Sequence, residues 1–147
     1  YYKGAHILHT LRYLIGNEIL RESLKEYMQM PKEFPHNQTS TKEFISLIQK
    51  NSGEDIQWFF DQYLYNHILP TLMVEEEIIN NKKFVEFWWK EEGFKMPIEI
   101  RFQSFDGERN RKLILNNSPN RIAIPVKSDL NIDPNNWVLY QLKKESK

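Results

Sequence analysis

The spacing of the apolar residues in this chain changes near Pro70. Before this proline they recur every three or four positions, as Ile7, Leu11 and Ile15 do, which is typical of a helix with one buried face. After it they alternate with polar residues, most clearly from Ile98 to Phe102, which is typical of a half-buried strand. The sequence therefore predicts an α+β fold in which helices precede strands.

The helical part covers residues 1–69, and we expect about four helices in it. Ser40 and Glu43 have the spacing of a capping box, in which a hydroxyl and a carboxylate each accept a hydrogen bond from a free backbone N–H. A helix is therefore expected to begin after Ser40 and to end at Gly53. The other helices are expected before Gly16, over 17–29 with Leu20, Leu24, Tyr27 and Met28 on one apolar face, and over about 54–66.

The second part covers residues 70–147, and we expect a small antiparallel β-sandwich there. Its apolar residues alternate in six or seven short segments with no helix among them, which is the pattern of a sandwich. Asn80-Asn81 and Asp106-Gly107 mark two of the turns. Strands are expected at about 72–78, 85–89, 98–103, 111–115, 122–126 and 137–142.

The composition argues against several classes of protein. Lys plus Arg and Asp plus Glu each number 20, so the formal net charge is zero, whereas a nucleic-acid-binding protein normally carries a basic face. No apolar run approaches the roughly 18–20 residues that cross a membrane, so no membrane span is expected. The chain has no cysteine, which excludes disulfides and thiolate metal sites but assigns no compartment.

Two histidines on the first predicted helix are close enough to share a metal ion. His6 and His9 are three residues apart, but a functional zinc site needs a third ligand and usually a carboxylate. Glu18 lies a few turns further on, and no third ligand is convincingly placed. We therefore expect no metal site in this chain.

A cluster of aromatic residues on one predicted strand has two interpretations. Phe84, Phe87, Trp88 and Trp89 follow one another closely, and their alternation favours a buried core with a covered second face. The alternative is an exposed platform on which sugars or bases stack.

The first residues lead into a helix at once. Tyr1-Tyr2-Lys3-Gly4-Ala5 opens the chain with no polar segment before the helical pattern. We expect the chain to be the downstream piece of a longer protein.

Motifs along the helical part resemble a known family in their order and spacing. They are Tyr1-x-Lys3-Gly4-Ala5 with Leu8, Leu11 and Arg12, then Ile15-Gly16-Asn17-Glu18, Ser40-Thr41-Lys42-Glu43-Phe44, and Ser52-Gly53-Glu54-Asp55-Ile56-Gln57-Trp58-Phe59-Phe60-Asp61-Gln62-Tyr63-Leu64. Together they resemble segments of the aminopeptidase N family of zinc metallopeptidases (gluzincins). Asn131-Ile132-Asp133-Pro134 and Trp137-Val138-Leu139 resemble the close of that family's β-sandwich domain.

The resemblance implies that one side chain of this chain belongs to an active site. The family holds zinc with His-Glu-x-x-His and a downstream glutamate, and neither is present here. The tyrosine of its Tyr-x-Lys-Gly motif helps to stabilise the oxyanion of the tetrahedral intermediate, and that position is Tyr1. Tyr2 lies about 100° further round the helix, so the role is not transferred to it. The parent would thus carry zinc, whereas this chain would carry only Tyr1 as a catalytic residue.

On this reading the chain is the end of a catalytic domain plus the β-sandwich domain that follows it. The parent would release N-terminal residues from a peptide substrate, and this fragment alone would be inactive. The remainder of the catalytic domain would pack on the helical half, which predicts an exposed apolar patch there and self-association of the isolated chain. Gly4 would permit a close helix approach, and Trp58–Leu64 would pack the last helix against the sandwich.

Other functions are compatible with the same residues. The chain could be a non-catalytic module whose β-sandwich binds a protein or, through Trp88 and Trp89, a carbohydrate. Glycyl aminopeptidases with PDZ-like domains have a similar Tyr-x-Lys-Gly helix, but the Phe-Phe-Asp-Gln segment followed directly by a sandwich fits them less well.

Overall fold

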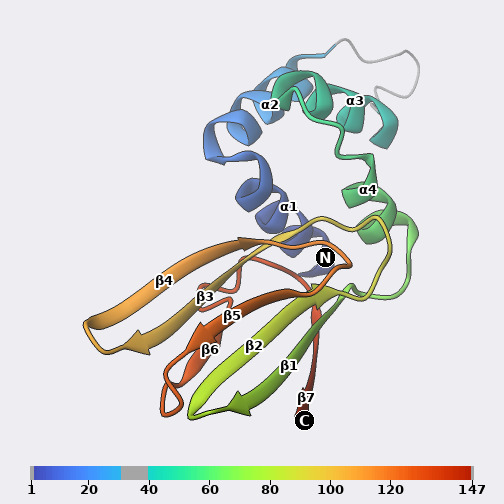
Figure 1. The fold of residues 1–147 in the computed structure, drawn as a ribbon. Coiled ribbons are helices and arrows are strands. Elements are labelled where there is room, and N and C mark those ends of the chain that lie inside the picture. Colours follow the sequence, from blue (N-terminus) through green and yellow to red (C-terminus); the bar gives the residue numbers. More distant parts are fainter. Residues whose placement is uncertain (1, 31–39, 147) are drawn as a thin grey trace. The chain divides into compact units, whose positions relative to one another are not determined.

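The chain folds into a helical unit followed by a β unit (Figure 1). The computed structural model describes residues 2–30 and 40–146, with Ser146 described in its backbone only. The two compact units are Tyr1–Asn66 and His67–Lys147. The predicted α+β class, with helices before strands, is confirmed. No helix among the described residues combines the length and the apolar character needed to cross a membrane.

The helical unit is built around a shared apolar core. Its elements are α1 (Tyr2–Ile15), α2 (Asn17–Gln29), α3 (Thr41–Ser52), α4 (Gln57–Phe60) and the π-helical turn η1 (Asp61–Tyr65). Helix α2 packs on both α1 and α3. The buried apolar side chains are Ile7, Leu11, Ile15, Leu20, Ile45, Leu47, Ile48, Ile56, Phe59, Phe60 and Tyr63.

The predicted boundaries of the third helix are confirmed. Ser40 Oγ accepts a hydrogen bond from the Glu43 N–H at 3.2 Å, and Glu43 Oε2 accepts one from the Ser40 N–H at 2.5 Å. These hydrogen bonds lower the pKa of Glu43. At the other end Gly53 has a φ of 70°, and its N–H donates to the Gln49 carbonyl. Both ends of α3 thus satisfy backbone groups that a helix terminus leaves free.

The last helix begins later than the sequence predicted. Asp55 Oδ1 accepts a hydrogen bond from the Gln57 N–H at 3.2 Å, so α4 starts at Gln57 and not near residue 54. The helix then widens into η1, where the Asn66 N–H donates to the Asp61 carbonyl at 3.0 Å. That five-residue spacing is the hydrogen-bond pattern of a π-helix.

The prediction that Met28 lies on the buried apolar face of α2 is wrong. Met28 is 77% exposed, and Ser23 is buried instead. The Ser23 hydroxyl donates to the Ile19 carbonyl at 2.7 Å and accepts from Asn51 Nδ2 at 3.0 Å. A buried hydroxyl is tolerated when it is hydrogen-bonded, which apolar periodicity alone does not reveal.

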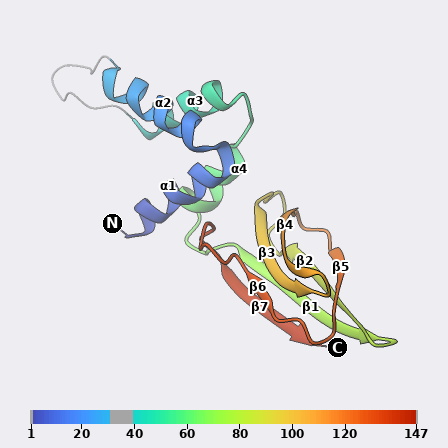
Figure 2. The ribbon, with the colours of Figure 1, turned by 90° about the vertical axis from the view of Figure 1, so that its left-hand side faces the viewer.

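The β unit consists of two sheets (Figure 2). Their strands are β1 (Thr71–Ile79), β2 (Lys82–Trp89), β3 (Pro97–Ser104), β4 (Gly107–Ile114), β5 (Asn120–Ile124), β6 (Leu130–Ile132) and β7 (Gln141–Ser146). One sheet has the order β5-β2-β1-β7 and the other the order β4-β3-β6. Alternate residues of β2 and β3 are buried, as predicted: Val85, Phe87, Trp89, Ile98, Ile100 and Phe102.

The end of the chain departs from the predicted strand pattern. β1 and β7 are parallel, so the four-stranded sheet is mixed and not purely antiparallel. β5 ends at Ile124, β6 was not predicted, and the strand expected at 137–142 begins only at Gln141.

The Asp133 carboxylate explains why the strand starts late. Asp133 is 4% exposed and has a φ of 49°, and its two oxygens accept hydrogen bonds from the Trp137 and Val138 N–H groups, each at 2.9 Å. The Asp133 N–H donates to the Glu99 carbonyl of β3 at 2.7 Å, whereas the N–H groups of Trp137 and Val138 are held by the Asp133 side chain and not by a neighbouring strand. Tyr140 lies close by, and burial together with the Asp133 charge raises the pKa of Tyr140 to about 12.

We predict that Asp133→Asn lowers the free energy of unfolding of the β unit by about 1.5–3 kcal/mol. The amide presents an NH₂ group to one of the two backbone donors, so a charge-assisted hydrogen bond is lost and a buried N–H is left unpaired. Urea denaturation monitored by tryptophan fluorescence measures the change. Asp129→Asn is the matched control, because Asp129 is exposed. Equal stability of the two variants would contradict the role of Asp133.

Candidate functional site

The residue assigned to catalysis by the sequence lies outside the described residues. Tyr1 is not described, and α1 begins at Tyr2. The neighbourhood that can be examined is the first turn of α1. Tyr2, Lys3, Gly4 and Ala5 are all exposed, with Tyr2 89% exposed. The described residues of the Tyr-x-Lys-Gly motif are therefore displayed to solvent.

The charges at the start of α1 favour a negative group. The first backbone N–H groups of a helix have no partner within the helix, and together they act as a partial positive charge. α1 has no acidic residue in its first turn, and Lys3 adds a positive charge there. A lysine at this end of a helix is unfavourable for the helix itself. A negative group placed near this turn would therefore be favoured by both the helix end and Lys3.

The packing role expected for Gly4 has no counterpart among the described residues. A Cβ atom built on Gly4 meets no described atom within 4 Å, apart from its chain neighbours and the helix's own backbone. The close helix approach expected at this position is absent among the described residues. The packing among residues 2–30 and 40–146 thus does not require a glycine here.

The two histidines of α1 lie beside one another. The His6 and His9 ring centroids are 5.9 Å apart in an edge-to-face arrangement. Arg12 donates to His9 Nδ1 at 2.9 Å, and because a guanidinium can only donate, the proton of the His9 ring lies on Nε2. His6 Nε2 is buried and has no hydrogen-bond partner among the described residues.

The residues present do not fit a zinc site. The described residues contain no group of three or more His, Asp or Glu side chains that could hold a metal ion. Glu18 is the carboxylate nearest in sequence to His6 and His9. It is hydrogen-bonded to Arg21 at 2.8 Å, and this contact lowers the pKa of Glu18. His-Glu-x-x-His is absent from the sequence. No chemical step through a metal can therefore be built from this chain alone.

The aromatic motif near the end of the helical unit is part of its core. The Phe59 ring lies 5.3 Å from that of Phe60 and 4.8 Å from that of Tyr63, and the Phe60 ring lies 6.2 Å from that of Phe44. Phe59, Phe60 and Tyr63 are fully or almost fully buried. These side chains stabilise the unit and contact no candidate site.

Trp89 of β2 is not available as a stacking surface. Trp89 is fully buried, and its indole N–H donates to the Met96 carbonyl at 2.8 Å. Trp88 is only half-buried. A sugar could not reach the Trp89 ring without unfolding the strand, so the core interpretation of this residue holds.

The helical unit leaves several large apolar side chains exposed among its described residues. Leu8 is 39% and Leu64 is 42% exposed, and the others are more exposed still. The full set is Tyr2, Leu8, Met28, Leu64 and Tyr65. They come from α1, α2 and η1, so the exposure is not confined to one helix end.

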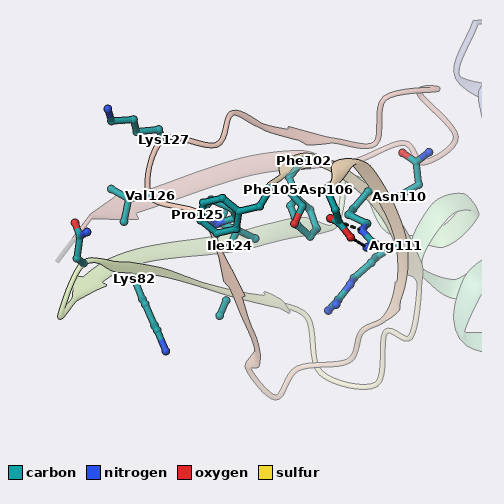
Figure 3. A pocket seen from close by; sticks show the side chains of 14 residues that line it. Lys82, Phe102, Phe105, Asp106, Asn110, Arg111, Ile124, Pro125, Val126 and Lys127 are labelled. Carbon is teal, nitrogen blue, oxygen red and sulfur yellow. Dashed lines mark hydrogen bonds and ion pairs between the residues drawn. The ribbon is translucent and has the colours of Figure 1, made fainter.

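Sequence reasoning missed a groove in the β unit (Figure 3). Its walls come from the β3–β4 hairpin, the end of β5 with the residues after it, and the start of β2. The alternation at 98–102 identified the buried face of β3. It did not show that the residues opposite on β4, Arg109 and Arg111, share that face.

Two comparisons with known proteins agree with the motifs. Residues 1–63 match the Peptidase family M1 domain. The chain is 26% identical over 145 residues to aminopeptidase N from Lactococcus lactis subsp. lactis. That alignment covers 95% of this chain and 16% of the relative, so the chain corresponds to a small part of that protein. The resemblance to the aminopeptidase family is confirmed.

We predict that Gly4→Ala raises the free energy of unfolding by about 0.4–1 kcal/mol. Alanine fits the helical backbone at this position and reduces the conformational entropy of the unfolded chain. Gly53→Ala is the matched control and should destabilise by a similar or larger amount, because Gly53 has a φ of 70°. Thermal unfolding followed by circular dichroism measures both changes. A destabilised Gly4→Ala variant would show that a neighbour within this chain needs the glycine.

Proposed function

We propose that this chain, a relative of the M1 aminopeptidases, is the last part of the catalytic domain of a zinc aminopeptidase together with a following β-sandwich domain. The catalytic part is residues 1–69 and the sandwich is residues 70–147. The observation that carries the proposal is the match of residues 1–63 to the peptidase domain, which ends close to the end of the helical unit at Asn66. The two sheets with buried alternating residues support a sandwich in the second part.

The catalytic contribution of this chain is a hydrogen bond from Tyr1. In the parent, residues outside this chain would hold the zinc ion, which polarises the scissile carbonyl. The Tyr1 phenol would donate to the oxygen of that carbonyl as it becomes an oxyanion. The positive end of α1 and the Lys3 charge lie next to Tyr1 in sequence and favour the same negative charge. The substrate would be a peptide from which the N-terminal residue is released.

The helical unit has a second role as a packing surface. The exposed apolar side chains of α1, α2 and η1 suit contact with the remainder of the catalytic domain. The unexplained Gly4 would allow that neighbour to approach the first turn of α1 closely. An isolated chain would expose this surface and associate with itself.

In the full-length parent we predict that Tyr1→Phe lowers kcat about 100- to 1000-fold with little change in KM. The phenylalanine keeps the ring but removes the hydroxyl that donates to the oxyanion, an interaction that exists only in the transition state. Hydrolysis of an aminoacyl chromogenic substrate measures the effect.

Tyr2→Phe is the matched control for that experiment. Tyr2 lies about 100° further round the helix, so its kcat should stay within about threefold of the parent. Equal losses for both variants would contradict the assignment of Tyr1. The isolated 147-residue chain should show no turnover with added zinc, and turnover that disappears in Tyr1→Phe would overturn the proposal that this chain lacks a complete site.

We further predict that the isolated chain self-associates through the helical unit. Sedimentation velocity should show a weight-average mass that rises with concentration, because apolar surface is buried on association. Leu8→Lys with Met28→Lys should reduce the association. Ile78→Lys with Ile114→Lys, two exposed positions of the β unit, is the matched control. A chain that is monomeric at all concentrations contradicts this prediction.

A further inference from the structure

The groove in the β unit lies between two edge strands. β4 is the outer strand of one sheet and β5 is the outer strand of the other. The groove has a volume of about 940 Å³. That volume is typical of a ligand site and far exceeds what a single small ion needs. Figure 3 shows Phe102, Ile124 and Pro125 gathered near its middle, with Lys82, Lys127 and Arg111 around them.

The register of β3 and β4 explains why the two sheets leave a groove at this place. Residues directly opposite one another in an antiparallel pair project to the same face. Ile98 lies opposite Leu113 and both are buried, but Ile100 lies opposite Arg111 and Phe102 opposite Arg109. The inner face of β4 therefore changes from apolar to basic toward the β3–β4 turn. The two arginines share the face of the buried Ile100 and Phe102, but both are themselves exposed.

Most of the positively charged side chains that line the groove have no ion-pair partner among the described residues. Arg109 is hydrogen-bonded to Asp106 of the same hairpin. Lys82, Arg111 and Lys127 have no carboxylate partner among residues 2–30 and 40–146. Three unpaired positive charges around one groove form a positive field there. This field is local, since the formal net charge of the whole chain is zero.

The groove also offers an apolar contact. Phe105, at the tip of the β3–β4 hairpin, is 96% exposed, and Pro125 and Val126 are half-buried beside the groove. Arg111 lies 5.9 Å from the Phe102 ring centroid, which supports its guanidinium against an aromatic surface. Aromatic and arginine side chains together are typical of protein-binding surfaces.

Two simpler explanations account for less of this arrangement. Inward-pointing charges on an edge strand protect the strand from pairing with another chain, but this protection needs neither a groove nor an exposed Phe105. A nucleic acid would require basic surface beyond the groove. The four-stranded sheet carries Glu75, Glu77 and Glu86 around one small hollow with Arg121, and the basic Arg101 and Lys112 beside Arg111 are mixed with Glu99.

We propose that this groove binds an acidic peptide segment. Its carboxylates would pair with Lys82, Arg111 and Lys127, and an apolar side chain between them would contact Phe105 and Pro125. The proposal does not rest on the peptidase assignment, because none of these residues belongs to the helical unit.

Fluorescence anisotropy of a labelled hexapeptide with five glutamates and one phenylalanine tests the proposal on the full 147-residue chain. The same peptide with glutamine in place of glutamate is the neutral control. The combined variant Lys82→Gln, Arg111→Gln and Lys127→Gln should weaken binding about tenfold, since three exposed ion pairs are lost. Binding should also weaken with rising salt.

The matched variant is Lys90→Gln, Lys95→Gln and Lys144→Gln, three exposed lysines of the same unit that do not line the groove. It changes the net charge equally and should weaken binding less than about twofold. Phe105→Ser should weaken binding without any change in charge. Equal losses in the two triple variants, or equal binding of the glutamine peptide, would overturn the proposal. Tighter binding of an oligothymidine of the same charge would overturn it in favour of a nucleic acid.

Discussion

Strand β2 is the element on which the β unit depends. It pairs with β1 on one side and with β5 on the other, and its Val85, Phe87 and Trp89 side chains are fully buried. Burying an indole N–H without a partner would cost about 1–3 kcal/mol. The Met96 carbonyl, directly before β3, accepts that hydrogen bond. One tryptophan thus fills the core and connects the four-stranded sheet to the segment that leads into the other sheet.

The features predicted correctly are those whose causes are local in sequence. The capping box at Ser40, the left-handed Gly53 and the alternation in β2 and β3 each involve residues a few positions apart, so the boundaries of α3 and the buried faces of the strands follow directly. The parallel pairing of β7 and the short strand β6 depend on partners far away in sequence. Periodicity carries no information about such partners. The loop at Asp133 depends on a carboxylate that accepts hydrogen bonds from N–H groups four and five residues on, which no alternation of apolar residues signals.

The candidate site divides in the same way. The Tyr-x-Lys-Gly motif could be identified from the sequence because its residues are consecutive, and it directs attention to Tyr1. The groove could not be identified from the sequence. Arg109 and Arg111 have the pattern of ordinary exposed residues there, and only the strand register shows that they lie opposite Phe102 and Ile100. Gly4 is an example of a motif residue whose role cannot be explained from one piece of a protein. The motif is present, but the neighbour that would explain it is absent among the described residues.

The parallel pairing of β1 and β7 has a mechanical consequence. The Gln141 N–H donates to the Pro70 carbonyl, and from there both strands run in the same direction for six residues, from Thr71 opposite Gln141 to Glu76 opposite Ser146. The two ends of this paired stretch therefore lie about 20 Å apart at the usual rise of a strand. Hydrogen bonds crosswise to these strands resist shear, so tension applied along the chain would load the whole ladder at once and not peel it apart one bond at a time.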